Sequence, residues 1–180
     1  MLSTKLVTSS EELEELFRIR YRIFVVEDKD APAQFYPDGI MKDECDKKAF
    51  HIGCYEDGGL IAFLSIVLKE VESTLPIEKQ HGFLAEKKSA EVMRLIIDRN
   101  KISATDIGKR AKIINLLLKE IKKIVLDHNL EILYLVSTEN AFALYKRIGF
   151  EQVGPYKLYE NVSYECPMKL KAVEYNDLLI

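Results

Sequence analysis

The sequence predicts an α/β protein built on a mixed β-sheet, and three observations support that prediction. Stretches with strand periodicity and helix periodicity alternate along the 180 residues. The turn sequence Asp57-Gly58-Gly59 separates two apolar runs and is a strong hairpin signal. In the second half, two stretches of helical periodicity flank a short apolar run. Hairpin strands followed by β-α-β units predict both antiparallel and parallel strand pairs.

The first half is predicted to contain a strand, a helix, a long connection and a hairpin. Ser9 and Ser10 offer a cap for the helix, and acidic residues follow them. A connection as long as 27–48 is uncommon and usually functional. The second hairpin strand is apolar on both faces, which predicts a central place in the sheet. The expected elements are a strand over 2–7, a helix from Ser9 or Ser10 to 26, a connection over 27–48, and strands over 49–55 and 60–70.

The second half adds four strands and two helices, which brings the expected sheet to about seven strands. The short helix is predicted to end at Gly149, a residue type that suits the position after a helix. The expected strands cover 89–97, 131–136, 151–159 and 162–170, and the helices cover 105–127 and 139–147. In the long helix, the apolar residues at helical spacing are Ile107, Ala111, Ile114, Leu118, Ile121 and Val125.

Composition excludes several classes of protein. The chain has 26 Lys and Arg against 29 Asp and Glu, whereas a dedicated nucleic-acid binder needs a clear basic excess. The apolar run from Leu60 to Leu68 is far shorter than the roughly 20 residues that span a bilayer. Three widely spaced cysteines and no Cys/His cluster predict no metal site. We therefore expect a single cytoplasmic domain over 1–180 without a membrane span or a nucleic-acid partner.

Arg20 is an unusual residue for its position. It lies three residues after Phe17 and four before Phe24, within the apolar stripe of the first helix. A guanidinium there either extends to water at the helix end or reaches a carboxylate, because a buried unpaired charge is very costly. Asp43 and Asp46, three residues apart in the connection, are the candidate partners.

A second charged pair, Glu91 and Arg94, lies in the strand predicted over 89–97. Positions three apart in an uninterrupted strand face opposite ways. A bulge between them would consume one residue and turn both side chains to the same face. The alternative is an ordinary strand with one polar residue pointing outward at its start.

The segment from Ile132 to Phe150 is the most specific in the chain. Its Asn, Ala, Tyr and Gly-Phe spacing resembles motif B of the GCN5-related N-acyltransferases, the GNAT superfamily, at Asn140, Ala143, Tyr145, Gly149 and Phe150. The element order is also similar to that fold over nearly the whole chain. The resemblance implies an acyl thioester donor with a pantetheine arm, held in a split between the fourth and fifth strands. It also implies a bulged fourth strand, a helix that begins at an Asn cap, and donor contacts at Met93, Leu95 and Asn140.

The start of the long helix departs from the superfamily pattern. Typical members bind the coenzyme A pyrophosphate with Arg/Gln-x-x-Gly-x-Gly/Ala, and only Gly108 fits that pattern cleanly in the stretch 105–111. Asp106 brings the wrong charge for an anion site. The helix amides could still bind phosphate, which keeps four residues as candidate donor contacts: Gly108, Lys109, Arg110 and Ala111.

Three spacings resemble a narrower branch, the acyl-homoserine-lactone synthases and the long-chain N-acyl amino acid synthases. These families have an Arg and a Phe four apart, two Asp three apart, and a Glu and an Arg three apart. The spacings occur here in Arg20 and Phe24, Asp43 and Asp46, and Glu91 and Arg94. The synthases' Trp is missing, and Ser65 stands at about the place of their Arg on the strand after the hairpin. The resemblance implies an acyl carrier protein as donor and places Phe24, Asp43 and Asp46 on the acceptor side.

Together these observations predict an N-acyltransferase in which an amine attacks the thioester directly, without a tightly bound cofactor or an acyl-enzyme. Glu91 is the candidate base, Tyr145 the candidate acid, and Arg20 and Arg94 would bind an acceptor carboxylate or order the long connection. Six basic and two acidic residues over 106–126 suggest a docking face for an acidic carrier protein, or simply a solvated helix face. Two alternatives remain: a coenzyme A-dependent acetyltransferase and a non-catalytic GNAT-like binding module.

Overall fold

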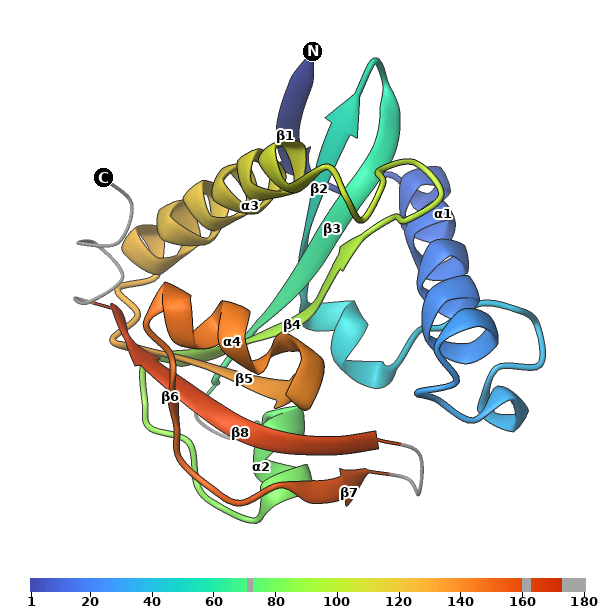
Figure 1. Cartoon of the computed structure of the whole chain (residues 1–180). Helices are drawn as coiled ribbons and strands as arrows, with labels where there is room; N and C mark the ends of the chain where they lie inside the picture. The colour runs from blue at the N-terminus through green and yellow to red at the C-terminus, as the bar shows by residue number, and fades with distance from the viewer. Residues whose placement is uncertain (71–72, 160–162, 173–180) are drawn as a thin grey trace. The chain divides into compact units, whose positions relative to one another are not determined.

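The computed structural model describes residues 1–70, 73–159 and 163–172, and it contains an eight-stranded sheet (Figure 1). The hydrogen-bonded order is β1-β2-β3-β4-β5-β8-β6, with β7 paired to β8. β4 and β5 are parallel, whereas the pairs β1–β2, β5–β8, β6–β8 and β7–β8 are antiparallel. The predicted mixed α/β sheet is confirmed, with one strand more than expected. The chain divides into two compact units, 1–65 with 94–120 and 66–93 with 121–180.

The first unit begins with a capped helix and a tight hairpin. The hydroxyl of Ser9 accepts the amide of Glu12 at 3.2 Å, so Ser9 is the helix cap. Asp57 and Gly58 have φ of 49° and 86°, the left-handed geometry that a two-residue hairpin turn requires. The elements are β1 (Leu2–Leu6), α1 (Ser10–Tyr21), the π-helical η1 (Arg22–Glu27), the 3-10 turns η2 (Ala33–Phe35) and η3 (Glu44–Lys48), β2 (Phe50–Glu56) and most of β3 (Gly59–Leu68).

The core of the first unit lies between α1 and the sheet. Leu16 is fully buried there, with Phe63 of β3 and Ile96 of β4, and Leu13, Phe17 and Phe24 pack against this cluster. Phe24 also packs against a second cluster formed by Val25, Ala31 and Met41, which lies under the long connection. The predicted apolar stripe of the first helix is therefore the face that the helix buries.

The second unit contains the remaining strands and two helices. Its buried strand residues include Leu133, Leu135, Met168 and Leu170. The sequence did not predict α2, a six-residue helix opened by Pro76. The elements are α2 (Pro76–His81), the first part of β4 (Ser89–Ile97), β5 (Ile132–Thr138), α4 (Glu139–Ile148), β6 (Glu151–Gln152), β7 (Lys157–Tyr159) and β8 (Ser163–Lys171), while α3 (Ile107–Asp127) belongs to both units.

The strand expected over 151–159 is wrong, because it is two short strands instead of one. The carbonyl of Pro167 in β8 accepts the amide of Val153. Proline has no backbone N–H, so Pro167 cannot donate a hydrogen bond back to Val153. A Cβ on Gly154 would come within 2.7 Å of the Pro167 ring. The ladder therefore stops at Gln152 and resumes at Lys157. The strand expected over 162–170 is β8, and residue 162 lies outside the described residues.

The apolar stripe predicted for the long helix is confirmed at Ile121 and Val125 and is wrong in the first half of the helix. Ile107 is 76% exposed and Ala111 is exposed, and the stripe that α3 buries is Ile113, Leu117, Ile121, Ile124 and Val125. Residues 113–118 are apolar except Asn115, so helical spacing alone does not choose between adjacent stripes. None of the described helices combines the length and apolarity needed to cross a membrane.

β4 is interrupted within its length. Arg94 has a φ of 55°, which a non-glycine residue rarely adopts inside a strand and which marks a break in the regular pleat. The parallel register with β5 joins Ser89–Glu91 to residues 132–134, while β4 continues to Ile97 and β5 to Thr138. The pairing of these two strands therefore ends three residues before the irregular position.

Candidate active site

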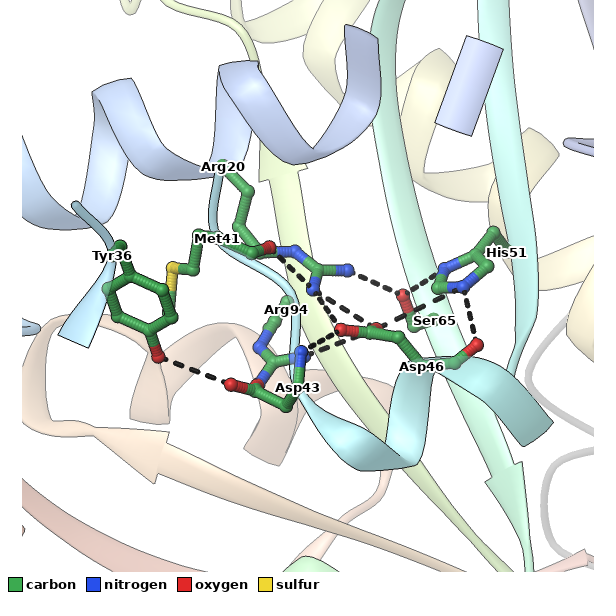
Figure 2. Close-up of polar contacts among 8 residues, drawn as sticks. All are labelled: Arg20, Tyr36, Met41, Asp43, Asp46, His51, Ser65 and Arg94. Carbon is green, nitrogen blue, oxygen red and sulfur yellow. Dashed lines mark hydrogen bonds and ion pairs between the residues drawn. The ribbon is translucent and has the colours of Figure 1, made fainter. Parts of the chain in front are cut away.

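Arg20 extends from α1 into a buried group of polar side chains (Figure 2). The guanidinium is 0% exposed, and its Nη1 donates to both carboxylate oxygens of Asp46 at 3.0 and 2.9 Å. Nη1 also contacts the carbonyl of Met41 at 3.3 Å, and Nη2 donates to the hydroxyl of Ser65 at 3.2 Å. Nε has no hydrogen-bond partner in the described part of the chain. Arg20 therefore reaches a carboxylate and does not extend to water.

Arg94 joins the same group from β4. Its Nη2 donates to Asp43, and its Nη1 lies 3.5 Å from Asp46. The backbone amide of Asp43 donates to Asp46 at 2.7 Å, which closes the turn of η3, and the hydroxyl of Tyr36 donates to Asp43 at 3.2 Å. Two arginines from regular elements thus hold two aspartates of the long connection, as Figure 2 shows. We call Arg20, Arg94, Asp43 and Asp46 the arginine–aspartate cluster.

His51, at the start of β2, lies next to this cluster. Its Nδ1 is 2.8 Å from the hydroxyl of Ser65, and its Nε2 is 3.2 Å from the carbonyl of Asp46. The imidazole is 4% exposed, and burial lowers its pKa below the usual value. A neutral imidazole satisfies both contacts, since one nitrogen donates to the Asp46 carbonyl and the other accepts from Ser65. The sequence analysis overlooked His51, although a histidine in a buried strand requires partners of this kind.

Opposite charges determine the ionisation of the cluster. Burial lowers the pKa of Arg20 to about 10, helped by the charge of Arg94 and opposed by Asp46, so Arg20 stays charged near neutral pH. Burial would raise the pKa of Asp46, but the charges of Arg20 and Arg94 outweigh it and hold the pKa below its usual range. Asp46 is therefore an anion near neutral pH and balances part of the charge of the two arginines.

The same aspartates with Cys45 resemble a metal site at first sight. One possible ligand atom from each of Asp43, Cys45 and Asp46 lies within 4.8 Å of the others. Both carboxylates already bind guanidinium groups, and burial raises the pKa of the Cys45 thiol. Two positive charges beside a protonated thiol do not fit a divalent cation, so we assign no metal to these residues.

Glu91 lies in β4 of the second unit and is 1% exposed. Its Oε2 accepts the backbone amide of Ile77, the second residue of α2, at 2.9 Å. An amide in the first turn of a helix has no acceptor within the helix, so it is available for this contact. The strand is irregular at Arg94 itself, whereas a bulge between Glu91 and Arg94 was predicted, and the two side chains have different partners, α2 for Glu91 and the aspartates for Arg94.

The start of α3 carries the residues predicted for a pyrophosphate. Oδ1 of Asp106 accepts the amide of Lys109 at 3.0 Å, so a carboxylate already caps this helix. The ammonium of Lys109 is bound to Glu56 at 2.7 Å. Gly108 and Ala111 are exposed, and a Cβ on Gly108 would meet nothing within 4 Å. The helix start therefore has a fixed anion and one neutralised cation, with Arg110 as its remaining basic residue.

The predicted residues of α4 lie in the second unit. Asn140 is not the helix cap, because Thr138 has that position and Asn140 is an exposed residue of the first turn. The expectation was wrong by two residues, because the helix begins at Glu139, directly after Thr138, the last residue of β5, and no side chain of the described residues caps it. Tyr145 is half-buried, its ring is 6.1 Å from that of Phe150, and burial raises its pKa to about 12. The helix ends as predicted at Gly149, which has a φ of 110°.

The predicted site residues thus fall into two groups. The first unit contains Arg20, Asp43, Asp46 and Arg94 in contact, and Phe24, which packs against Val25, Ala31 and Met41. It also contains Leu95, Gly108, Lys109, Arg110 and Ala111. The second unit contains Glu91, Met93, Asn140 and Tyr145.

Solved structures with this fold have low sequence identity to the chain. FeeM, an N-acyl amino acid synthase from uncultured soil microbes, is 15% identical with a TM-score of 0.71, covering 100% of this chain and 95% of its own. The AHL synthase LasI is 16% identical with a TM-score of 0.74, over 96% and 90%. BjaI, a CoA-dependent acyl-homoserine lactone synthase with bound MTA, is 15% identical with a TM-score of 0.73, over 99% and 88%.

The family itself is shown by sequence. No curated protein matches the chain. A family model described as N-acyl amino acid synthase FeeM matches residues 15–173, which is most of the chain and includes both groups of predicted site residues. The protein is therefore an N-acyltransferase with a GNAT-like fold, and it belongs to the FeeM N-acyl amino acid synthase family.

Proposed function

We propose that this enzyme moves an acyl group from the pantetheine thioester of an acyl carrier protein to the amine of a small acceptor such as an amino acid. The family match supports the reaction class. The observation that carries the choice of donor is the carboxylate of Asp106 on the amide of Lys109. A coenzyme A donor would bring its pyrophosphate to this helix start, where it would meet a fixed negative charge.

Glu91 is the proposed base. The acceptor amine must lose a proton as it attacks the thioester carbonyl, and a carboxylate held by one amide accepts that proton directly or through a water. The backbone is irregular at Arg94, and we propose that strand amides near Met93 point to the thioester carbonyl and stabilise the oxyanion. The tetrahedral intermediate then expels the pantetheine thiolate, so no acyl-enzyme forms.

Tyr145 is proposed to donate a hydrogen bond to the leaving sulfur. Its pKa of about 12 keeps the phenol protonated at neutral pH. Full proton transfer to a thiolate whose conjugate acid has a pKa near 8.5 would be uphill by about 5 kcal/mol. The hydrogen bond stabilises the developing negative charge without that transfer.

The arginine–aspartate cluster is proposed to order the long connection, with Asp43 at the acceptor side. Arg20 is fully buried and the side chain of Asp46 is 5% exposed, so neither has room for a substrate. The side chain of Asp43 is 32% exposed and can approach a cationic or amine group. Phe24 packs against the same connection and would form the apolar part of the acceptor site.

The exposed face of α3 is the proposed docking surface for the carrier protein. Lys112 and Lys119 are exposed and seven residues apart, which places them on one side of the helix. Lys109 is excluded from this surface because it is bound to Glu56. Exposed lysines attract an acidic partner and raise the rate of encounter, and salt weakens that attraction.

The test compares donors and reverses the docking charges. We expect transfer from an acyl carrier thioester to exceed transfer from the same acyl group on coenzyme A at matched concentration. Lys112→Glu with Lys119→Glu should raise KM for the carrier donor by about tenfold or more, because each charge contributes to steering. The control reverses Arg18 and Lys47, two exposed bases of the same unit that lie off α3. Equal KM values for both double variants would exclude this docking surface.

A coenzyme A donor is the second candidate, because BjaI, a CoA-dependent acyl-homoserine lactone synthase, is similar in structure. In that case acyl-coenzyme A would be the better donor. Asp106→Asn would then lower its KM by removing the negative charge at the helix start, and leave the carrier reaction unchanged.

A further inference from the structure

A closed circuit of contacts in the second unit ends on Glu91. Lys69 follows β3, and its backbone amide donates to the carbonyl of Ser89 in β4 at 2.9 Å. The ammonium of Lys69 binds both carboxylate oxygens of Glu78 in α2 at 2.9 and 2.8 Å. The amide of Ile77, next to Glu78, donates to Glu91, two residues beyond Ser89 on β4. The circuit therefore runs from β4 through Lys69 and α2 back to β4.

Glu78 holds the whole α2 segment together. In addition to Lys69, its carboxylate accepts the amide of Leu75 at 2.6 Å and the amide of Ala85 at 2.8 Å. The Glu78 side chain is 2% exposed and that of Lys69 is 10% exposed. Burial would raise the pKa of Glu78, but its hydrogen bonds from Lys69, Ala85 and Leu75 outweigh this and lower it, so the group is an anion near neutral pH.

Among the described residues, the other side-chain hydrogen bonds to α2 reach its far end. Gln80 donates to Glu165 at 2.6 Å, and Lys157 donates to the carbonyl of His81 at 2.7 Å. Both attach the last two residues of the helix to β8 and β7. The first turn is held by the Glu78 carboxylate and by the burial of Leu75 and Ile77. Loss of Glu78 or of its cation would remove the polar part of this support from the end of the helix that contacts Glu91.

We infer that Lys69 and Glu78 are positioning residues for acyl transfer, because they fix the Ile77 amide that orients the Glu91 carboxylate. This inference rests on the proposed function, in which Glu91 is the base. Loss of that hydrogen bond would weaken the orientation of the Glu91 carboxylate, on which proton transfer depends. The amide also favours the ionised form of the carboxylate, which is the form that accepts a proton.

The test measures kcat, KM and the pH profile for Lys69→Met and Glu78→Gln. We expect kcat to fall by about tenfold, less than the roughly 100-fold loss expected for Glu91→Gln. KM for the donor should stay within about twofold, and the low-pH limb of the kcat profile should move to higher pH. Lys69→Arg keeps the cation and should recover most of the rate. The matched control is Glu131→Gln, which breaks the exposed ion pair with Lys88 in the same unit.

A double-mutant comparison separates this inference from the proposed function. If Glu78 acts through Glu91, adding Glu78→Gln to Glu91→Gln should lower kcat no further. Full activity of Glu91→Gln would overturn the base assignment and the inference with it. Loss of activity in Glu91→Gln together with unchanged kcat in Glu78→Gln would overturn only the inference.

Unfolding of a variant would not decide the question, so circular dichroism accompanies each measurement. If Glu78→Gln is unfolded, Glu78→Asp keeps the charge but shortens its reach, and its pH profile is then the deciding measurement. A fall in kcat with an unmoved pH profile, or an equal further loss in the Glu91→Gln background, would show a purely structural role.

Discussion

Two buried ionic groups stabilise the two units in different ways. In the first unit, Asp46 of the arginine–aspartate cluster binds Arg20 twice, contacts Arg94 and accepts one backbone amide, that of Asp43. In the second unit, Glu78 binds one lysine and two backbone amides. Asp46 therefore keeps one backbone donor if its arginines are lost, whereas Glu78 keeps two if its lysine is lost.

The difference follows from what each group has to hold. The long connection in the first unit contains only short 3-10 turns, and cations from α1 and β4 reach into it to hold its two aspartates. The segment around α2 turns back on itself, and its own amides surround Glu78. Removing a cation should therefore cost more stability in the first unit than in the second.

The largest expected effect is that of Arg20→Met. The variant leaves Asp46 buried without its main partner, and breaking a buried pair in this way costs about 3–5 kcal/mol. Urea denaturation should show this fall in the free energy of unfolding, together with loss of acyl transfer. Arg18→Met, two residues before Arg20 but 56% exposed, is the control and should change the free energy by about 0.5 kcal/mol or less. Similar values for both variants would mean that Arg20 is not needed by the cluster.

Lys69→Met should have a smaller effect, about 1–3 kcal/mol. Glu78 keeps the amides of Leu75 and Ala85, so its charge is only partly stranded. The measurement is again urea denaturation, with Lys88→Met as an exposed control. A loss equal to that of Arg20→Met would remove the distinction between the two groups.

Acid should weaken both groups. The pKa values of Asp46 and Glu78 are lowered in the folded state. The stability that these two groups contribute to the fold is therefore fully present above their pKa values in the unfolded chain, about 3.9 and 4.3. It is lost as pH falls through the lower folded values, at no more than about 1.4 kcal/mol per pH unit for each group. Denaturation between pH 3 and pH 6 (roughly the range around these values) should give a shallower slope for Asp46→Asn and for Glu78→Gln than for the parent. Glu14→Gln, in an exposed pair with Arg18, should keep the parent's slope.

The smallest expected effect concerns the two buried histidines. His51 has partners at both ring nitrogens, whereas neither ring nitrogen of His81 has one in the described part of the chain. His51→Phe should lower the free energy of unfolding by about 1 kcal/mol or more, because Ser65 and the Asp46 carbonyl lose a partner. His81→Phe should leave it unchanged or raise it by about 1 kcal/mol, because two unsatisfied polar atoms disappear. The opposite order in thermal denaturation would contradict the assignment of partners.

The arginine–aspartate cluster could be predicted because Arg20 is anomalous where it stands. A charged residue in an apolar stripe requires a partner, and two aspartates at a regular spacing were available. Lys69 and Glu78 gave no such signal, because each lies at the end or edge of an element where charges are normally exposed. Their burial comes from the way α2 turns back on itself, which no local periodicity describes.

The elements followed the same rule. The strands with apolar residues on both faces, β3 and β5, were predicted within two residues of their observed bounds. A short, continuous apolar run bounded by turn residues indicates a buried strand. The buried face of α3 was not predicted in its first half, because Ile113, Ile114, Leu117 and Leu118 offer two adjacent stripes and tertiary packing chooses between them. The split of the last predicted strand depended on Pro167, which lies on the neighbouring strand and not in the segment itself.

The π-helical segment Arg22–Glu27 has a consequence for comparing relatives by residue number. Its hydrogen bonds skip one residue more than those of an α-helix, as in the bond from the Asp28 amide to the Ile23 carbonyl at 2.8 Å. A relative with an ordinary α-helical turn here would reach the long connection with one residue fewer. Residues of α1 before Arg20 can therefore be aligned between such chains without a gap. The interval from Arg20 to Asp43 needs a one-residue gap in the alignment.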